Sequence, residues 1–322
     1  MAKRSGIIGF LNTAIREAEK AEMRRQKIVA KIQALQDAQN SFDAWRNYIF
    51  SITHIHDNLN PASVFYQNKE IKKPILPEIS DLEEKTALEN LNCYRPSFFD
   101  KLFRLTEKKI HKLKEELKIA KYNDLIRFHK ANNTYNEELG KWNKIQEIIN
   151  GIENNNIDSI KEFLDYSNAF NDISLYIENI EIENPEGFID AKIYLKNDQS
   201  LIPNNELKLT ATGKISKKNM PETKKNEIYY DHVSSIILSA AISLFNHLPI
   251  NVARISALKS TLNPATGKFE WIPILSFIPE LNIFNNLNFE MLAPSSSLSN
   301  FKCNVDFKKN RGFNAIKIIE LS

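Results

Sequence analysis

The chain is poor in cysteine and carries little net charge. It has 2 Cys, Cys93 and Cys303, among 322 residues, which excludes a disulfide scaffold, argues against a Cys-rich metal site and suits a reducing compartment. A formal charge of +3 cannot by itself indicate nucleic-acid binding, so any such case must depend on local basic clusters. We therefore expect a cytoplasmic protein.

Long apolar runs are also missing. No segment reaches the ~18 apolar residues that a membrane span needs, and Met1–Gly6 lacks the apolar core and cleavage site of a secretory signal. We therefore expect no membrane partner. The hydrophobic share of 42% is nevertheless enough to bury a core, which excludes wholesale disorder.

Motifs of catalysis are absent as well. The sequence contains no H-E-x-x-H, paired C-x-x-C, G-x-S-x-G or G-x-G-x-x-G, and this absence argues against an enzyme. The segment 264–269 has a Gly-Lys pair without the full phosphate-binding loop, and no helix follows it, so it predicts a hairpin turn. We expect no cofactor.

Two long helices are predicted in the first half, over residues 5–55 and 97–149. Each has one apolar stripe that is too narrow to be stable alone, so we expect them to pack as an antiparallel coiled coil, on each other or on a second copy. A proline-rich connector, 57–96, separates them and contains a capping-box spacing that predicts a short helix near 80–90. The stripe of the first helix comprises Ile8, Leu11, Ile15, Ala18, Val29 and Ile32.

The second half has the pattern of mixed helices and strands. We predict helices at 157–170 and 225–247, strands at 207–215 and 315–321, and hairpins at 174–195 and 251–278. The helix at 225–247 is apolar or small on every face, so it should be buried against a sheet. The predicted fold is therefore α+β, with a helical hairpin domain over 1–150 and a domain of antiparallel hairpins packed on a buried helix over 151–322.

Basic residues cluster at one place on each long helix. Lysines and arginines at 3-4 spacing share a helical face, where they could neutralise phosphates and release counterions. The alternative is a solvated face, or pairing with the acidic segment 151–200. The candidate nucleic-acid residues are Arg24, Arg25, Lys27 and Lys31 in the first cluster, and Lys108, Lys109, Lys112 and Lys114 in the second.

Three short segments imitate catalytic or metal sites. The histidines of Thr53–Asp57 are two residues apart at a helix end, where they point to different faces. Asp231 and His232 have no nucleophile in view, so Asp231 is expected to complement the helix dipole. Asp190-Ala191-Lys192 imitates the acid-x-Lys end of a restriction-type nuclease, but an alternating, half-exposed strand explains it better. We predict no metal site.

Three stretches together resemble an uncharacterised bacterial family with long charged helices followed by a compact α+β part. They are the opening Met1–Leu11, the helix from Tyr229 to Leu248, and Leu262–Gly267, which is similar to an I-x-P-A-T-G turn in that family. Some longer members continue into a Mrr-type restriction endonuclease domain, which this sequence lacks. The resemblance implies, by association only, a mobile-element or phage-defence setting.

The leading hypothesis is a non-enzymatic interaction or scaffold protein of bacterial defence type, which self-associates or holds a protein partner through its long helices. The second is a nucleic-acid-binding module that uses the basic helix faces. The third is a diverged metal-dependent nuclease around Asp190 and Lys192.

Overall fold

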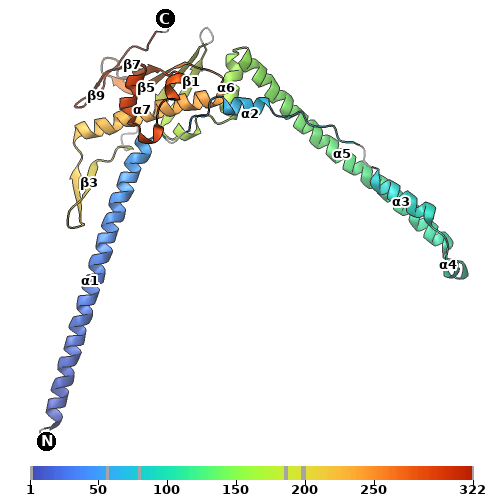
Figure 1. Cartoon of the computed structure of the whole chain (residues 1–322), viewed down its shortest axis with the longest axis horizontal. Coiled ribbons are helices and arrows are strands. Elements are labelled where there is room, and N and C mark those ends of the chain that lie inside the picture. Colours follow the sequence, from blue (N-terminus) through green and yellow to red (C-terminus); the bar gives the residue numbers. More distant parts are fainter. Residues whose placement is uncertain (1–2, 56–57, 79–80, 185–187, 197–200, 321–322) are drawn as a thin grey trace. The chain divides into compact units, whose positions relative to one another are not determined.

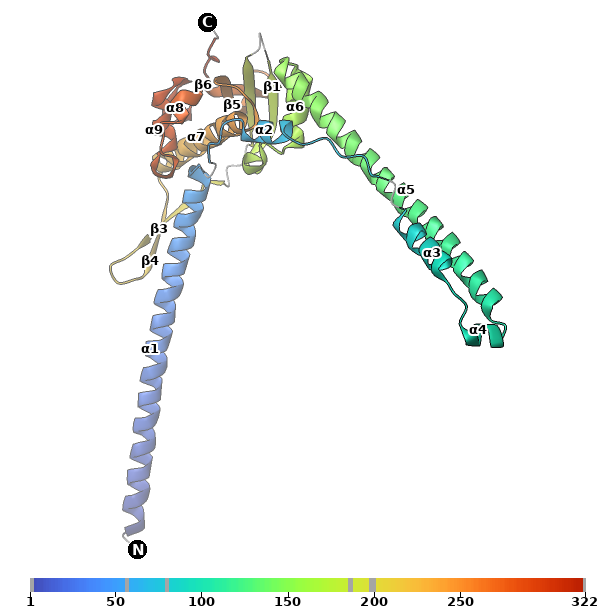
Figure 2. The ribbon, with the colours of Figure 1, turned by 45° about the vertical axis from the view of Figure 1, so that its right-hand side comes forward.

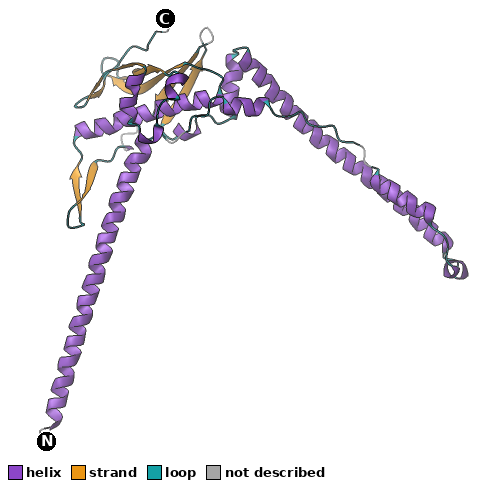
Figure 3. Cartoon of the chain, viewed as in Figure 1, coloured by secondary structure: helices purple, strands orange, loops and turns teal. Residues whose placement is uncertain are grey.

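The computed structural model describes residues 3–55, 58–78, 81–184, 188–196 and 201–320, with the backbone alone for 3–15, 18 and 290. Its contacts divide into two compact units (Figure 1). Unit 1 comprises residues up to Ala62 and from Asn168 onward, and unit 2 is Ser63–Ser167. These boundaries do not coincide with the predicted division at residue 150. Helices and strands are both present (Figure 3), which confirms the α+β class.

Unit 1 is built on a five-stranded mixed sheet with the order β1-β2-β5-β6-β7. The two predicted hairpins are confirmed as the antiparallel pairs β1–β2 and β5–β6, but β2 and β5 lie side by side in parallel. The strands of the sheet are β1 (Ile177–Glu183), β2 (Ile189–Leu195), β5 (Ala253–Asn263), β6 (Lys268–Ile278) and β7 (Lys302–Val305). Of the predicted turn at 184–187, residues 185–187 lie outside the described part.

The parallel pair explains the buried helix. A tight turn cannot join parallel neighbours, which need a crossover connection, and α7 (Glu222–His247) supplies it between β2 and β5. Val233, Ile237, Leu238 and Leu244 of α7 are fully buried, as predicted from its all-round apolar composition. By length and composition α7 is also apolar enough to span a membrane, although no segment was predicted to be. However, 78% of its most apolar window is buried within the protein.

The first long helix is confirmed as α1 (Lys3–Thr53), and its C-terminal end is anchored on α7. His232 Nδ1 lies 2.5 Å from the carbonyl of Ile52, so this nitrogen carries the proton and donates it, and Ser235 Oγ donates to the carbonyl of His54 at 2.8 Å. These side chains satisfy carbonyls that the end of a helix leaves without partners.

A small hairpin also packs on α1, and here the predicted single strand at 207–215 is wrong. The chain forms β3 (Asn205–Leu209) and β4 (Ile215–Asn219), joined by a turn in which Gly213 has φ +75°. A side chain at Gly213 would be strained at that φ, and its Cβ would lie 2.7 Å from Leu35 of α1. The hairpin also accepts a hydrogen bond from Trp45 of α1 at the carbonyl of Asn205.

The C-terminal end differs from the predicted strand at 315–321. Residues 314–320 form no strand, because their hydrogen bonds go to scattered groups and not to one neighbouring ladder. Ile319 N–H, for example, donates to Ser276 Oγ at 3.3 Å, and the carbonyl of Lys317 accepts from Asn304 at 2.7 Å. Further short elements at this end are α8 (Leu281–Phe284), α9 (Pro294–Ser297), and the paired strands β8 (Phe307–Lys308) and β9 (Gly312–Phe313).

Unit 2 is organised along the second long helix, α5 (Thr106–Glu153), beside which α3 (Leu82–Cys93) runs antiparallel (Figures 1 and 2). Glu84 N–H donates to Asp124 at 2.9 Å, and Glu83 pairs with Arg127. The predicted helix near 80–90 is therefore confirmed as α3, whereas the predicted start of the long helix at Ser97 is a separate turn, α4. The helices of this unit are α2 (Ser63–Lys69), α3 (Leu82–Cys93), α4 (Phe98–Leu102), α5 (Thr106–Glu153) and α6 (Ile157–Tyr166).

The two long helices belong to different units, α1 to unit 1 and α5 to unit 2. Their antiparallel pairing, in one molecule or between two, stays a prediction. The stripe residues Ile8, Leu11, Ile15 and Ala18 lie outside the described side chains.

The anchor of α1 on His232 predicts a pH dependence of folding. Burial lowers the pKa of His232 from its ordinary 6.5, so below about pH 6.5 the unfolded chain binds more protons than the folded chain. We expect the free energy of unfolding to fall as the pH drops through 6.5 towards the folded pKa, as measured by urea unfolding from about pH 8 to about pH 5. His232→Gln should flatten this dependence, and the exposed His111→Gln should not.

Candidate functional site

The predicted basic cluster on α1 lies on an open part of the helix. Arg24, Arg25, Lys27 and Lys31 are all exposed, and none of them forms an ion pair with another described residue. Their charge is therefore available to an external partner.

Helix geometry extends this cluster and removes one member. At about 100° per residue, five basic residues fall within about 80° of arc, and this arc faces the same way as the α1 side chains that reach the β3–β4 hairpin. Arg25 points away from the arc. We call these five residues the basic arc of α1: Arg16, Lys20, Arg24, Lys27 and Lys31.

The predicted basic cluster on α5 is divided by pairing. Lys109 Nζ lies 2.6 Å from Asp100, and Lys112 lies 3.7 Å from Glu116. Lys108 and Lys114 are exposed, without an ion pair in the described chain. Only half of this cluster is therefore available to bind phosphate.

The ion pair between Asp100 and Lys109 stabilises the turn between α3 and α5. The side chain of Asp100 also accepts from Tyr94 and from the backbone N–H of Ser97, both at 3.1 Å, while its own N–H donates to Ser97 Oγ in a capping box. Lys109, with these hydrogen bonds, holds the pKa of Asp100 well below its ordinary range. Lys109 therefore has a structural role.

The described residues of the histidine motifs have separate partners. His54 stacks on Phe50, whereas His56 and Asp57 lie outside the described residues. Asp231 accepts from Ser295 and His232 donates to Ile52, so these two neighbours serve different partners. Among the described residues there is no group of three or more His, Cys, Asp or Glu that could hold a metal ion.

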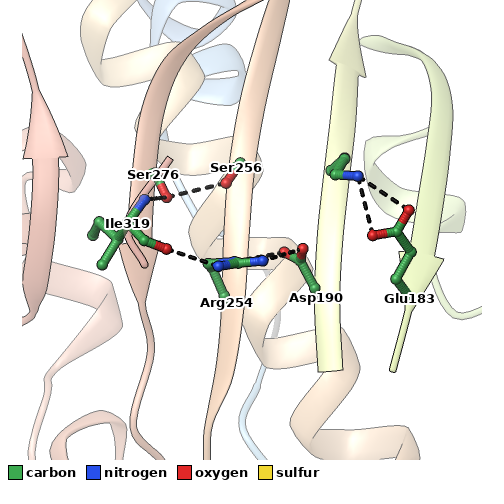
Figure 4. Close-up of polar contacts among 7 residues, drawn as sticks. Glu183, Asp190, Arg254, Ser256, Ser276 and Ile319 are labelled. Carbon is green, nitrogen blue, oxygen red and sulfur yellow. Dashed lines mark hydrogen bonds and ion pairs between the residues drawn. The ribbon is translucent and has the colours of Figure 1, made fainter. Parts of the chain in front are cut away.

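Each of the nuclease-like residues has a partner, and Figure 4 shows Asp190 beside Arg254. Asp190 is 1% exposed and receives two hydrogen bonds from Arg254, from Nε at 3.0 Å and from Nη2 at 2.5 Å. Arg254 Nη1 also donates to the carbonyl of Ile319 at 2.7 Å. A carboxylate held by a bidentate arginine has both oxygens occupied.

Lys192 is paired separately. Its ammonium lies 3.1 Å from both oxygens of Glu183, and the side chain of Glu183 is 54% exposed. The acid and the lysine of the motif thus belong to two separate ion pairs on neighbouring strand positions. The predicted half-exposed strand is wrong, because no residue of β2 is exposed and Asp190 is buried.

The residue that the sequence analysis missed is Arg254. Its signal is the alternation of polar and apolar residues at the start of β5, where Arg254 and Ser256 lie between the apolar residues Ala253, Ile255 and Ala257. Ser256 Oγ donates to Ser276 Oγ at 3.0 Å in the same row. The pairing of Arg254 with Asp190 depends on the parallel register of β2 and β5, which no local pattern specifies.

Comparison of the chain with protein-family models, with curated proteins and with solved structures gives no match in any of the three. The resemblance to the bacterial family with long charged helices therefore stays a prediction.

The buried ion pair predicts a strong stability effect at the nuclease-like motif. Asp190→Ala leaves the Arg254 guanidinium, whose side chain is 15% exposed, without its counter-ion. Breaking a buried pair by removing one partner costs about 3–5 kcal/mol, so we expect the free energy of unfolding to fall by about that amount in chemical denaturation.

Lys192→Ala is the matched control, because its partner Glu183 is largely exposed. Removing such an exposed pair should cost less than about 1 kcal/mol. A small effect of Asp190→Ala, close to that of Lys192→Ala, would contradict a structural role for Asp190.

Proposed function

We propose that the protein is a non-enzymatic interaction protein that self-associates through α1. The observation that supports this most is the exposure of large apolar side chains on α1, namely 59% for Ile28, 65% for Val29 and 58% for Ile32. All described side chains between residues 19 and 34 of this helix are exposed. A helix of this kind gains most of its stability by burying an apolar face.

A second copy of α1 is the partner that the charge distribution favours. Ile28, Val29 and Ile32 occupy an arc of about 100° on the side of the helix away from the basic arc. Two copies can therefore meet through these residues while the basic arc of each remains in solvent. Arg25 lies within the apolar side, next to the acid Glu22, so in an antiparallel pair each Arg25 can approach the opposite charge of the other copy.

The setting in bacterial defence is part of the same proposal and depends only on the resemblance of three sequence segments to a family with restriction-associated members. The nuclease alternative receives no support from the geometry, because Asp190 is held by Arg254.

Self-association is tested by replacing Ile28, Val29 and Ile32 together with serine. Each fully buried Val or Ile side chain contributes roughly 1.5–3 kcal/mol, so the dissociation constant of the dimer should rise at least roughly a hundredfold. Analytical ultracentrifugation over a concentration series measures it.

Met23→Ser is the matched control for this experiment. Met23 is 54% exposed but lies on the other side of the helix, so this variant should dimerise like the parent. A parent protein that stays monomeric at every concentration, with circular dichroism showing an intact helix, overturns the proposal.

Nucleic-acid binding by the basic arc is a second candidate, favoured by the absence of ion pairs at Arg24, Lys27 and Lys31 in the described chain. A row of positive charges along one helix can follow a phosphate backbone without reading its sequence. The last residue of the basic arc, Lys31, lies one helical turn before Leu35 on α1. The tip of the β3–β4 hairpin packs against Leu35.

Charge reversal tests this second candidate. The triple variant Arg24→Glu, Lys27→Glu and Lys31→Glu should weaken binding to double-stranded DNA and reduce the salt slope of log K by about 0.9 for each phosphate that is no longer neutralised. Fluorescence anisotropy across a salt series measures both quantities.

Arg25→Glu is the matched control, because it changes charge on the opposite side of α1 and should have a much smaller effect. If the reversal of Lys108 and Lys114 abolishes binding and the α1 variant does not, the binding face is on α5 and the assignment to α1 is wrong.

A further inference from the structure

An exposed cluster of large apolar residues lies at the turn between α3 and α5 in unit 2. Phe98, Phe99, Leu102 and Phe103 are between 61% and 74% exposed, and Leu105 is 38% exposed. Five large apolar side chains are thus exposed within eight residues, and the rings of Phe98 and Phe99 contact each other. Exposed apolar patches mark interaction sites. We call these five residues the apolar tip.

The apolar tip is held in a defined conformation. Asp100, which lies among these residues, is 4% exposed and completes the capping box of α4 with Ser97. Its carboxylate also accepts from Tyr94 and pairs with Lys109. Its carbonyl also accepts from Leu105 N–H at 2.8 Å, which closes the turn. Arg104 has φ +50°, an uncommon value for a residue with a side chain, which persists only where the surrounding contacts fix it. The phenylalanines are therefore presented outward by a built turn.

Basic residues alternate with the tip residues or flank them in the sequence. Arg95, Lys101, Arg104 and Lys108 are exposed, and none of them forms an ion pair with another described residue. Glu107 is the exposed acid within the same stretch. The tip thus combines apolar side chains with an excess of positive charge.

We propose that the apolar tip docks onto an anionic bilayer surface. Phenylalanine and leucine side chains can enter the boundary between headgroups and acyl chains, while neighbouring lysine and arginine side chains keep their charges at the phosphate level. This is peripheral contact without any span of the membrane, so it departs from the expectation of no membrane partner, which considered only spans and signals. It goes beyond the proposed function and is independent of α1.

The charge and the chemistry favour a lipid surface over the other occupants. Two copies meeting tip to tip would bring like charges together. Single-stranded nucleic acid is recognised by aromatic stacking, yet Leu102 and Leu105 have no aromatic face for a base. An anionic bilayer satisfies both the apolar and the basic side chains at once.

Vesicle co-sedimentation tests the proposal with the full chain. We expect binding to vesicles of phosphatidylcholine mixed with phosphatidylglycerol, weaker binding to phosphatidylcholine alone, and a bound fraction that falls with rising salt. The triple variant Phe98→Ser, Phe99→Ser and Phe103→Ser should lower the affinity at least roughly tenfold, and Lys101→Glu with Lys108→Glu should remove the preference for anionic vesicles.

Ile119→Ser with Leu125→Ser is the matched control, because these side chains on α5 are 57% and 52% exposed but lie away from the tip. This variant should bind like the parent, and circular dichroism verifies that every variant is folded. Three outcomes overturn the proposal: no binding to anionic vesicles at low salt, equal binding of the triple serine variant and the parent, or a tip that is needed only for dimerisation or for binding single-stranded DNA.

Discussion

Burial of α7 is the constraint on which the rest of unit 1 depends. A helix that is apolar on every side must be covered on every side, and the sheet, the end of α1 and the short C-terminal elements together cover it. The crossover through α7 places β2 beside β5 in parallel, and thereby joins two hairpins that are each local in sequence into one sheet, in which β7 is the fifth strand. The same helix supplies His232 and Ser235, which fix the end of α1.

This construction accounts for most of the polar residues that imitate a catalytic site. Asp190 pairs with Arg254, and Arg254 donates to the carbonyl of Ile319 in the C-terminal segment. Asp231 accepts a hydrogen bond from Ser295. Basic side chains without an ion pair among the described residues include those of the basic arc of α1 and those near the apolar tip in the sequence.

The regular elements could be predicted because their signals are local. The burial of α7, the length of α1 and the pairing of β5 with β6 follow from composition and period alone, and each is confirmed. The failures occur where a local turn or a distant partner interrupts the expected element. At Gly213 the chain turns with φ +75°, a value that glycine adopts without strain, so the predicted strand becomes a hairpin. The helix α4 separates from α5 because Asp100 completes a capping box with Ser97 and Arg104 leaves the helical region. The tail after Asn314 follows hydrogen-bond partners on β6 and the preceding loops.

By itself, the sequence determined the identity of the strongly periodic elements, because helix and strand periods depend on neighbours within a few residues. It did not determine every boundary, since α5 begins at Thr106 and not at Ser97. The sequence also determined where basic residues share a helix face. Only the tertiary structure decided which basic side chains form ion pairs. Lys109 pairs with Asp100, whereas Lys108 is exposed without an ion pair in the described chain. The tertiary structure also decided that Asp190 meets Arg254 and that five apolar side chains remain uncovered at one turn. These outcomes depend on contacts between residues far apart in the chain, and on the absence of such contacts among the described residues at the apolar tip.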